Sequence, residues 1–122
     1  MLFRSFHVGP IERGEKDQSR RIWKRCIVKV GHCYPIQVDY RTKARGYIRV
    51  TAVRQERLGD ITEADAKREG GYTVSSFREL WCGIRGPDAW NPQQMVYVVE
   101  FVYVGRTKLA PLDVSAPTMA VA

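Results

Sequence analysis

A lysine, a serine and two arginines lie together in the octet at residues 14–21, GEKDQSRR. Lys16 precedes the hydroxyl of Ser19 by three residues, and Arg20 and Arg21 follow directly. A serine alcohol becomes an effective nucleophile when a nearby base takes its proton, and a neutral lysine amine can be that base. Neighbouring positive charge favours the neutral amine. The octet therefore indicates either a serine–lysine catalytic pair or a solvated basic turn.

Few other side chains have the character of metal ligands or catalytic groups. The three cysteines, Cys26, Cys33 and Cys82, are an odd number without a Cys-x-x-Cys pair, which indicates reduced thiols. A zinc site would have to combine them with His32, and the adjacent pair of His32 and Cys33 is poor ligand spacing. We therefore expect no metal and no cofactor.

Size and composition predict one ordinary globular domain. The chain has 122 residues, of which 44% are hydrophobic and 27% charged, and a single core can account for this length. The formal net charge of +7 favours an anionic partner or pocket, nucleic acid above all. No apolar run approaches the ~20 residues that cross a bilayer, and the N-terminus lacks a signal-peptide core. We expect a cytoplasmic protein without a membrane partner, either a monomer or a weak dimer.

Apolar and β-branched segments predict the strands, and capping residues predict the helices. The expected strands are residues 2–7, 26–30, 46–53 and 95–104. Residues 11–13 could form a short helical turn, and residues 31–44 read as a loop or a broken strand pair. Thr62 with Asp65 resembles a capping box that opens a short helix ending at Gly70 and Gly71.

A second helix begins at Thr73, and its apolar residues recur at three- and four-residue spacing. They are Val74, Phe77, Leu80, Trp81 and Ile84. Residues 83–94 carry turn formers and predict a loop. The fold class is therefore α+β and mostly β: a small barrel with short helices packed on its rim. Residues 1–105 form the domain, and residues 106–122 form a C-terminal extension whose last residues, 115–122, are frayed.

Several separated pieces of the chain resemble, in order, the ASCH domain family of the PUA-like superfamily. The family's glycine–lysine–glutamine–hydroxyl–arginine pattern is present as Gly14, Lys16, Gln18, Ser19 and Arg21. It is followed by LGDITEADA at residues 58–66, by Glu69 and Gly70, by a helix with Phe77 and Trp81, and by the strand at residues 96–101. The resemblance covers roughly residues 3–104.

The resemblance implies a PUA-like barrel with a cleft between the octet and the helix that carries Glu69. Some ASCH-like proteins are amidohydrolases that remove the acyl group from 4-acetylcytidine. Carried over position by position, their catalytic set is Lys16, Ser19 and Glu69, where those enzymes can have threonine in place of Ser19. Other ASCH proteins are thought to bind or cleave RNA, so the resemblance does not fix the reaction.

Under the amidohydrolase hypothesis, Lys16 takes the proton of Ser19, which attacks the acyl carbon, and Glu69 assists the departing amine. Arg21 or backbone N–H groups of the octet would stabilise the oxyanion, and Gln18 belongs to the same substrate-binding segment. Candidate aromatic surfaces for the base are Trp23, Tyr40 and Trp90, whereas Trp81 lies on the apolar helix face and favours a core role.

The alternatives are an RNA-binding module and a ribonuclease that uses the same basic cleft. An RNA track would use the cationic residues Arg13, Lys16, Arg20, Arg21, Lys24 and Arg25. The interleaved acidic residues Glu12, Glu15 and Asp17 would each cancel favourable charge on such a track. They favour a small-molecule partner, a modified nucleoside or base, with RNA as the second choice.

Glu100 interrupts the most apolar predicted strand. A carboxylate among valines needs a partner, so we expect an ion pair with an arginine such as Arg21 or Arg49.

Overall fold

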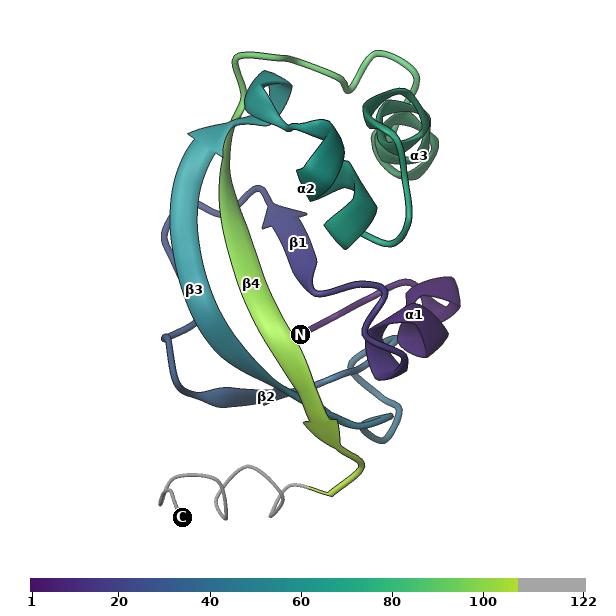
Figure 1. The fold of residues 1–122 in the computed structure, drawn as a ribbon, viewed down its shortest axis with the longest axis vertical. Coiled ribbons are helices and arrows are strands. Elements are labelled where there is room, and N and C mark those ends of the chain that lie inside the picture. Colours follow the sequence, from purple (N-terminus) through teal and green to yellow (C-terminus); the bar gives the residue numbers. More distant parts are fainter. Residues whose placement is uncertain (108–122) are drawn as a thin grey trace.

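Two long strands form the centre of a strongly curved antiparallel sheet (Figure 1). They are β3 (Tyr47–Arg57) and β4 (Met95–Gly105), and the short strands β1 (Gln18–Arg21) and β2 (Cys33–Pro35) pair with their outer edges. The strand order is β1-β4-β3-β2 in a four-stranded sheet. This computed structural model describes residues 1–107; the predicted frayed tail at 115–122, and nearly all of the predicted extension, lie outside the described residues.

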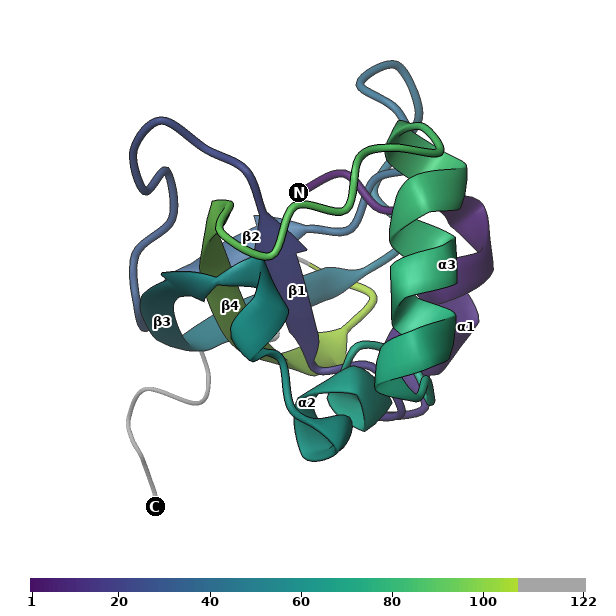
Figure 2. The same ribbon diagram turned by 90° about the horizontal axis from the view of Figure 1, so that it is seen from above.

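The helices surround one side of this half-barrel. They are η1 (Ser5–His7), α1 (Val8–Glu12), η2 (Leu58–Asp60), α2 (Glu63–Arg68) and α3 (Val74–Arg85). In both views α1 and α3 lie on the same side of the molecule, across from β3 (Figure 1, Figure 2). The predicted α+β class, with short helices against a barrel-like sheet, is confirmed. None of the helices within residues 1–107 has the length and apolar character required to cross a membrane.

Both predicted helix starts are confirmed at the level of hydrogen bonds. The hydroxyl of Thr62 accepts from the Asp65 amide at 3.1 Å, and that of Thr73 accepts from the Ser76 amide at 3.0 Å. Both form complete capping boxes, which supply partners for amides that the helix leaves free. Helix α2 ends before Gly70, whose φ of 143° is accessible mainly to glycine.

Two predicted strands are absent. In residues 2–7 only Leu2 makes a bridge, to Gln37, and the chain then turns into η1 and α1. The buried residues of this N-terminal segment, Phe3, His7, Val8 and Ile11, follow helical spacing. The alternation of residues 2–7 did not indicate this spacing. Residues 26–30 form no strand because only Val28 is buried there, whereas Ile27 and Val30 are exposed.

Three element boundaries also differ from the prediction. The octet, expected as a turn or cleft segment, ends in strand β1, and β2 lies in the stretch expected as a loop or broken strand pair. Helix α3 continues three residues into the predicted loop, as far as Arg85. The buried side chains form two clusters, one around Phe3, Ile11 and Phe101 and one around Leu58, Phe77 and Val98. Strand β4 contributes to both clusters.

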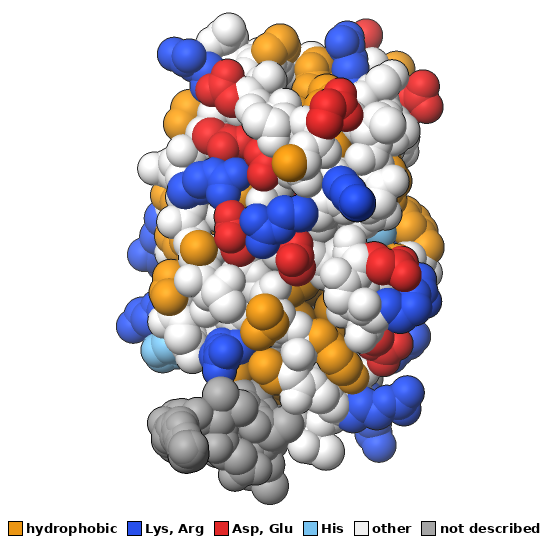
Figure 3. All heavy atoms as spheres, in the orientation of Figure 1, with side chains coloured by type: hydrophobic (Ala, Val, Ile, Leu, Met, Phe, Trp, Pro, Cys, Tyr) orange, Lys and Arg blue, Asp and Glu red, His pale blue; other side chains and the backbone are white. Residues whose placement is uncertain are grey.

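The face drawn in Figure 3 carries acidic and basic side chains next to one another. The carboxylate of Glu100 is itself paired, with Arg54 at 2.6 Å and with Arg68 at 3.3 Å. The expected ion pair with an arginine is confirmed, but the partners are Arg54 and Arg68 and not Arg21 or Arg49. The irregularity between Val50 and Ala52 shifts the register, so that Glu100 lies opposite Ala52 and near Arg54. This face therefore presents alternating charge and no continuous basic track.

Candidate functional site

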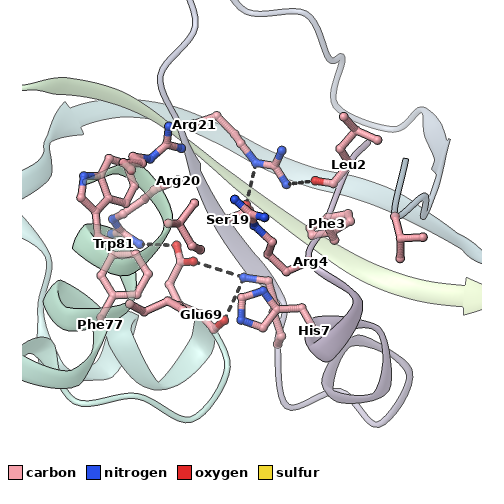
Figure 4. Close-up of a pocket in the computed structure, with 15 residues that line it drawn as sticks. Leu2, Phe3, Arg4, His7, Ser19, Arg20, Arg21, Glu69, Phe77 and Trp81 are labelled. Atoms are coloured by element: carbon pink, nitrogen blue, oxygen red, sulfur yellow. Dashed lines mark hydrogen bonds and ion pairs between the residues drawn. The ribbon is translucent and has the colours of Figure 1, made fainter. Parts of the chain in front are cut away.

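A cavity of about 390 Å³ opens beside the edge strand β1. Its walls come from the N-terminal segment, from the octet and from α3, with Glu69 between them (Figure 4). The lining residues are Leu2, Phe3, Arg4, His7, Lys16, Ser19, Arg20, Arg21, Val38, Glu69, Phe77, Leu80, Trp81, Ile84 and Arg85. The volume falls in the range of small-ligand pockets, and one wall is apolar and partly aromatic.

Lys16 and Glu69 form a buried ion pair at the bottom of this arrangement. The Lys16 ammonium donates to Glu69 Oε1 at 3.2 Å, to the Glu69 carbonyl at 2.8 Å and to the Gln18 carbonyl at 2.8 Å. Both side chains are only 3–4% exposed. The three donors of the ammonium are thereby satisfied, as a buried charge requires.

Burial lowers the pKa of Lys16, and the nearby Arg21 and Arg20 lower it further, while Glu69 opposes the shift. A lowered pKa makes the neutral amine, the form that can accept a proton, more accessible. The Lys16–Glu69 contact at 3.2 Å also provides a route by which the ammonium proton can pass to the carboxylate.

Arg20 holds the other side of the Glu69 carboxylate and connects it to a supporting network. Its guanidinium lies 2.9 Å from Glu69 Oε2, 2.7 Å from Glu56 and 3.3 Å from Asp65. It also donates to the side chain of Gln18, which in turn donates to Asp65 at 3.2 Å. Glu69 therefore has both carboxylate oxygens fixed, which sets the orientation of the side chain toward Lys16.

Ser19 points to the opposite face of β1 from Arg20 and contacts Arg21 instead. The Arg21 Nε–H donates to the Ser19 hydroxyl at 2.8 Å, and Arg21 Nη2 donates to the Leu2 carbonyl at 2.7 Å. Figure 4 shows these two bonds and the Glu69 contacts within one opening. A cation that donates to a serine oxygen stabilises negative charge on that oxygen.

The predicted catalytic residues Lys16, Ser19 and Glu69 all line the cavity, together with the predicted substrate-binding residue Arg21. The other predicted binding residues do not line it. Gln18 is fully buried in the network with Arg20, and Tyr40 is 82% exposed. Trp23 packs against Tyr97, and Trp90 packs against Phe77 and Trp81. The aromatic wall comes instead from Trp81, which is buried as expected, and from Phe77.

Sequence patterns did not indicate Arg4, His7 or Arg85 as pocket residues. Arg4 and His7 belong to a segment that the pattern assigned to a strand, and Arg85 to a predicted loop. Only the helical course of residues 5–12 and the extra turn of α3 bring them to the octet. Within residues 1–107 no group of three histidine, cysteine or acidic side chains has the arrangement of a metal site, and Cys26 is exposed.

His7 is a buried histidine in contact with this site. Its Nε2 lies 2.8 Å from the Tyr72 hydroxyl. Burial, followed by the charges of Lys16 and Arg21, lowers the pKa of His7 from 6.5 to about 4. The ring is therefore neutral at pH 7, and protonating it would add a further buried cation beside Lys16.

This shift predicts that folding stability decreases as the pH is lowered from about 6.5 to about 4. In that window the unfolded chain binds a proton at residue 7 and the folded chain does not, so stability rises with pH and is complete above pH 6.5. The contribution is at most about 3 kcal/mol. Urea unfolding of the wild type and of His7→Gln at several pH values measures it. The variant should show a flatter profile in this window, and identical slopes would contradict the prediction.

Comparisons with known proteins place the fold. No protein-family model matches the sequence, and no curated protein matches it. An ASCH domain from Lactobacillus crispatus JV V101 has a similar structure, with a TM-score of 0.68 and 18% identity over 80% of this chain and 70% of that chain. Protein EF3133 from Enterococcus faecalis V583, of the DUF984 family, gives a TM-score of 0.61 and 18% identity over 82% and 71%.

A point mutant of ZmASCH from Zymomonas mobilis gives a TM-score of 0.60 with 11% identity, over 84% of this chain and 66% of that chain. The predicted resemblance to ASCH domains is thus confirmed at the level of the fold. At these identities the likeness concerns the fold alone. Any assignment of a substrate or of catalytic residues must therefore come from the geometry of the cavity.

Proposed function

We propose that this protein is an amidohydrolase that removes the acyl group from N4-acylated cytidine or cytosine, with Lys16, Ser19 and Glu69 as its catalytic residues. The observation that carries this proposal is the convergence of these side chains, from separate segments, in one cavity with an aromatic wall. A hydroxyl, a buried lysine of lowered pKa and a fixed carboxylate are the groups that acyl transfer from an amide requires.

The first step is attack of Ser19 Oγ on the acyl carbonyl carbon. Transfer of a proton from the Lys16 ammonium to Glu69 produces the neutral amine, and the lowered pKa of Lys16 makes this form more accessible. In this structure Lys16 donates to Gln18 and Glu69, while Ser19 contacts Arg21. For the Lys16 amine to accept the proton of the attacking Ser19 hydroxyl, it must exchange one of these bonds for a hydrogen bond with that hydroxyl, a rearrangement that substrate binding commonly brings.

Arg21 is suited to stabilise the negative charge of this step. Its Nε–H already contacts the serine oxygen, and its Nη1 has no hydrogen-bond partner within residues 1–107. A preorganised donor of this kind contributes about 3–4 kcal/mol to the transition state. Glu69, protonated in the first step, then donates its proton to the departing cytosine amine, and as a carboxylate activates the water that releases the acyl group.

The aromatic wall supplies a surface for the planar base. Phe77 and Trp81 are packed at a centroid separation of 6.0 Å, and both line the cavity. Their positions on α3, across from the octet, would place a stacked base between the wall and Ser19 (Figure 4).

The direct test is hydrolysis of 4-acetylcytidine by the purified chain, followed through the change in absorbance as cytidine forms. We expect turnover without added cofactor. A panel of N4-acylcytosines with larger acyl groups, assayed in parallel, tests whether the enzyme prefers an acyl group other than acetyl. Failure to release cytidine or cytosine from every member of the panel would contradict the proposal.

RNA binding or cleavage is the second candidate, and the excess of arginine in the cavity favours it. Arg4, Arg21 and Arg85 line the same opening as the single carboxylate of Glu69. Affinity for single-stranded RNA would then decrease steeply with salt, whereas hydrolysis of a neutral nucleoside would change little. On the face drawn in Figure 3, however, acidic side chains lie between the basic ones, so the positive charge of the cavity does not continue there as a basic track.

A further inference from the structure

Three arginines in the cavity have no carboxylate partner within residues 1–107: Arg4, Arg21 and Arg85. The described part of the chain does not lack acidic groups, because Arg20, Arg54 and Arg68 each pair with at least two of them. The cavity therefore holds three arginines without a carboxylate partner, beside Lys16 and Arg20, which pair with Glu69.

Two of these arginines are held by aromatic rings on opposite walls. The guanidinium of Arg21 lies 4.8 Å from the ring centroid of Phe3, and that of Arg85 lies 4.2 Å from the ring centroid of Trp81. Both rings line the cavity. Such stacking fixes the plane of a guanidinium and leaves its N–H edge free to donate.

The arginines also repel one another. Burial lowers the pKa of Arg21 to about 10, with Glu69 opposing the shift and Arg85 adding to it. Burial lowers the pKa of Arg85, and the charge of Arg4 adds to this shift. Repulsion between cations in one opening is relieved when an anion binds between them.

The basic residues and Ser19 become more exposed from the inner end of the cavity to its mouth. Lys16 and Ser19 are buried, Arg21 is partly buried, and Arg4 and Arg85 are exposed. The reacting amide therefore belongs at the inner end, near Ser19, and a charged group on the same substrate would lie at the mouth, near Arg4 and Arg85.

We propose that Arg4 and Arg85 form a subsite for the phosphate monoester of a nucleotide, so that the preferred substrate is an N4-acylated cytidine monophosphate rather than the neutral nucleoside. This rests on the proposed function for the reaction and on the arginines for the subsite. A phosphate monoester carries close to two negative charges at pH 7 and accepts hydrogen bonds from several guanidinium groups at once.

The kinetic test compares 4-acetylcytidine with its 5′-monophosphate as substrates of the full chain. We expect kcat/KM to be about tenfold higher for the monophosphate, since one charge-assisted contact is worth about that factor. Arg85→Ala should bring the ratio of the two kcat/KM values, monophosphate over nucleoside, close to one. Arg78→Ala is the matched control: Arg78 is on the same helix and stacks on Trp90 at 5.8 Å, outside the cavity, so the preference should persist.

A binding measurement separates the subsite from the reaction. Calorimetry with cytidine 5′-monophosphate, cytidine and inorganic phosphate should show tightest binding of the monophosphate, weakened by Arg85→Ala and not by Arg78→Ala. If this pattern appears without hydrolysis, the subsite stands and the amidohydrolase proposal is wrong. Equal binding of cytidine and its monophosphate, or of inorganic phosphate and the monophosphate, would overturn the subsite. Tighter binding of a single-stranded oligonucleotide than of the monophosphate would also overturn the monophosphate subsite.

Discussion

Ser19→Ala is expected to lower kcat for 4-acetylcytidine by at least about a thousandfold, because the substitution removes the attacking oxygen. The protein should stay folded, since within residues 1–107 Ser19 makes one side-chain hydrogen bond, to Arg21, whose loss costs about 1 kcal/mol. Steady-state hydrolysis, with thermal unfolding of the same samples, measures both effects.

Ser19→Thr is the matched variant because it keeps a hydroxyl at the same position. It should retain activity well above that of the alanine variant, with a loss that reflects the extra methyl group in a buried strand. If Ser19→Ala hydrolyses 4-acetylcytidine at the wild-type rate, Ser19 is not the nucleophile, and a water activated by Lys16 or Glu69 would have to replace it.

Glu69→Gln is expected to lower the free energy of unfolding by about 3–5 kcal/mol, the usual cost of removing one partner of a buried charge pair. The carboxylate of Glu69 compensates the Lys16 ammonium at 3.2 Å and one edge of Arg20 at 2.9 Å, and its side chain is 4% exposed. Arg20 keeps Glu56 and Asp65 as partners, so the main uncompensated charge in the variant is that of Lys16.

The size of this loss should decrease as the pH rises. Without Glu69, the group that raises the pKa of Lys16 is gone, so burial lowers that pKa further below its value of 10.5 in the unfolded chain. The folded variant then binds fewer protons than the unfolded chain over this range, and its stability increases with pH. Urea unfolding at pH 6 and at pH 9 tests the direction.

Glu15→Gln is the control for the removal of one carboxylate. Glu15 pairs with Arg13 at 2.9 Å, but these side chains are 55% and 59% exposed. Solvent screens an exposed pair, which then contributes little to stability, so this variant should unfold close to the wild type. Equal losses for the Glu69 and Glu15 variants would mean that the Lys16–Glu69 pair does not stabilise the fold.

Elements with strong local signals could be predicted from the sequence. The capping boxes at Thr62 and Thr73 and the apolar strand at residues 95–104 depend on neighbours within a few residues. Where burial depended on distant contacts, prediction failed. Residues 26–30 have the composition of a strand, but no strand of the sheet pairs with them, and all of them except Val28 are exposed.

For the candidate site, the sequence by itself determined the chemical groups: Lys16, Ser19 and Arg21 lie within one short segment, and the resemblance added Glu69. Tertiary structure alone decided their contacts. Alternation along β1 directs Ser19 and Arg21 to one face and Arg20 to the other, and the cavity at the edge of this strand is open to both. The sequence could not show that the helical path of residues 5–12 brings His7 and Arg4 to the octet, or that α3 brings Arg85. The contact between His7 and Tyr72 joins positions 65 residues apart, and the shape of the site depends on how both core clusters pack against β4.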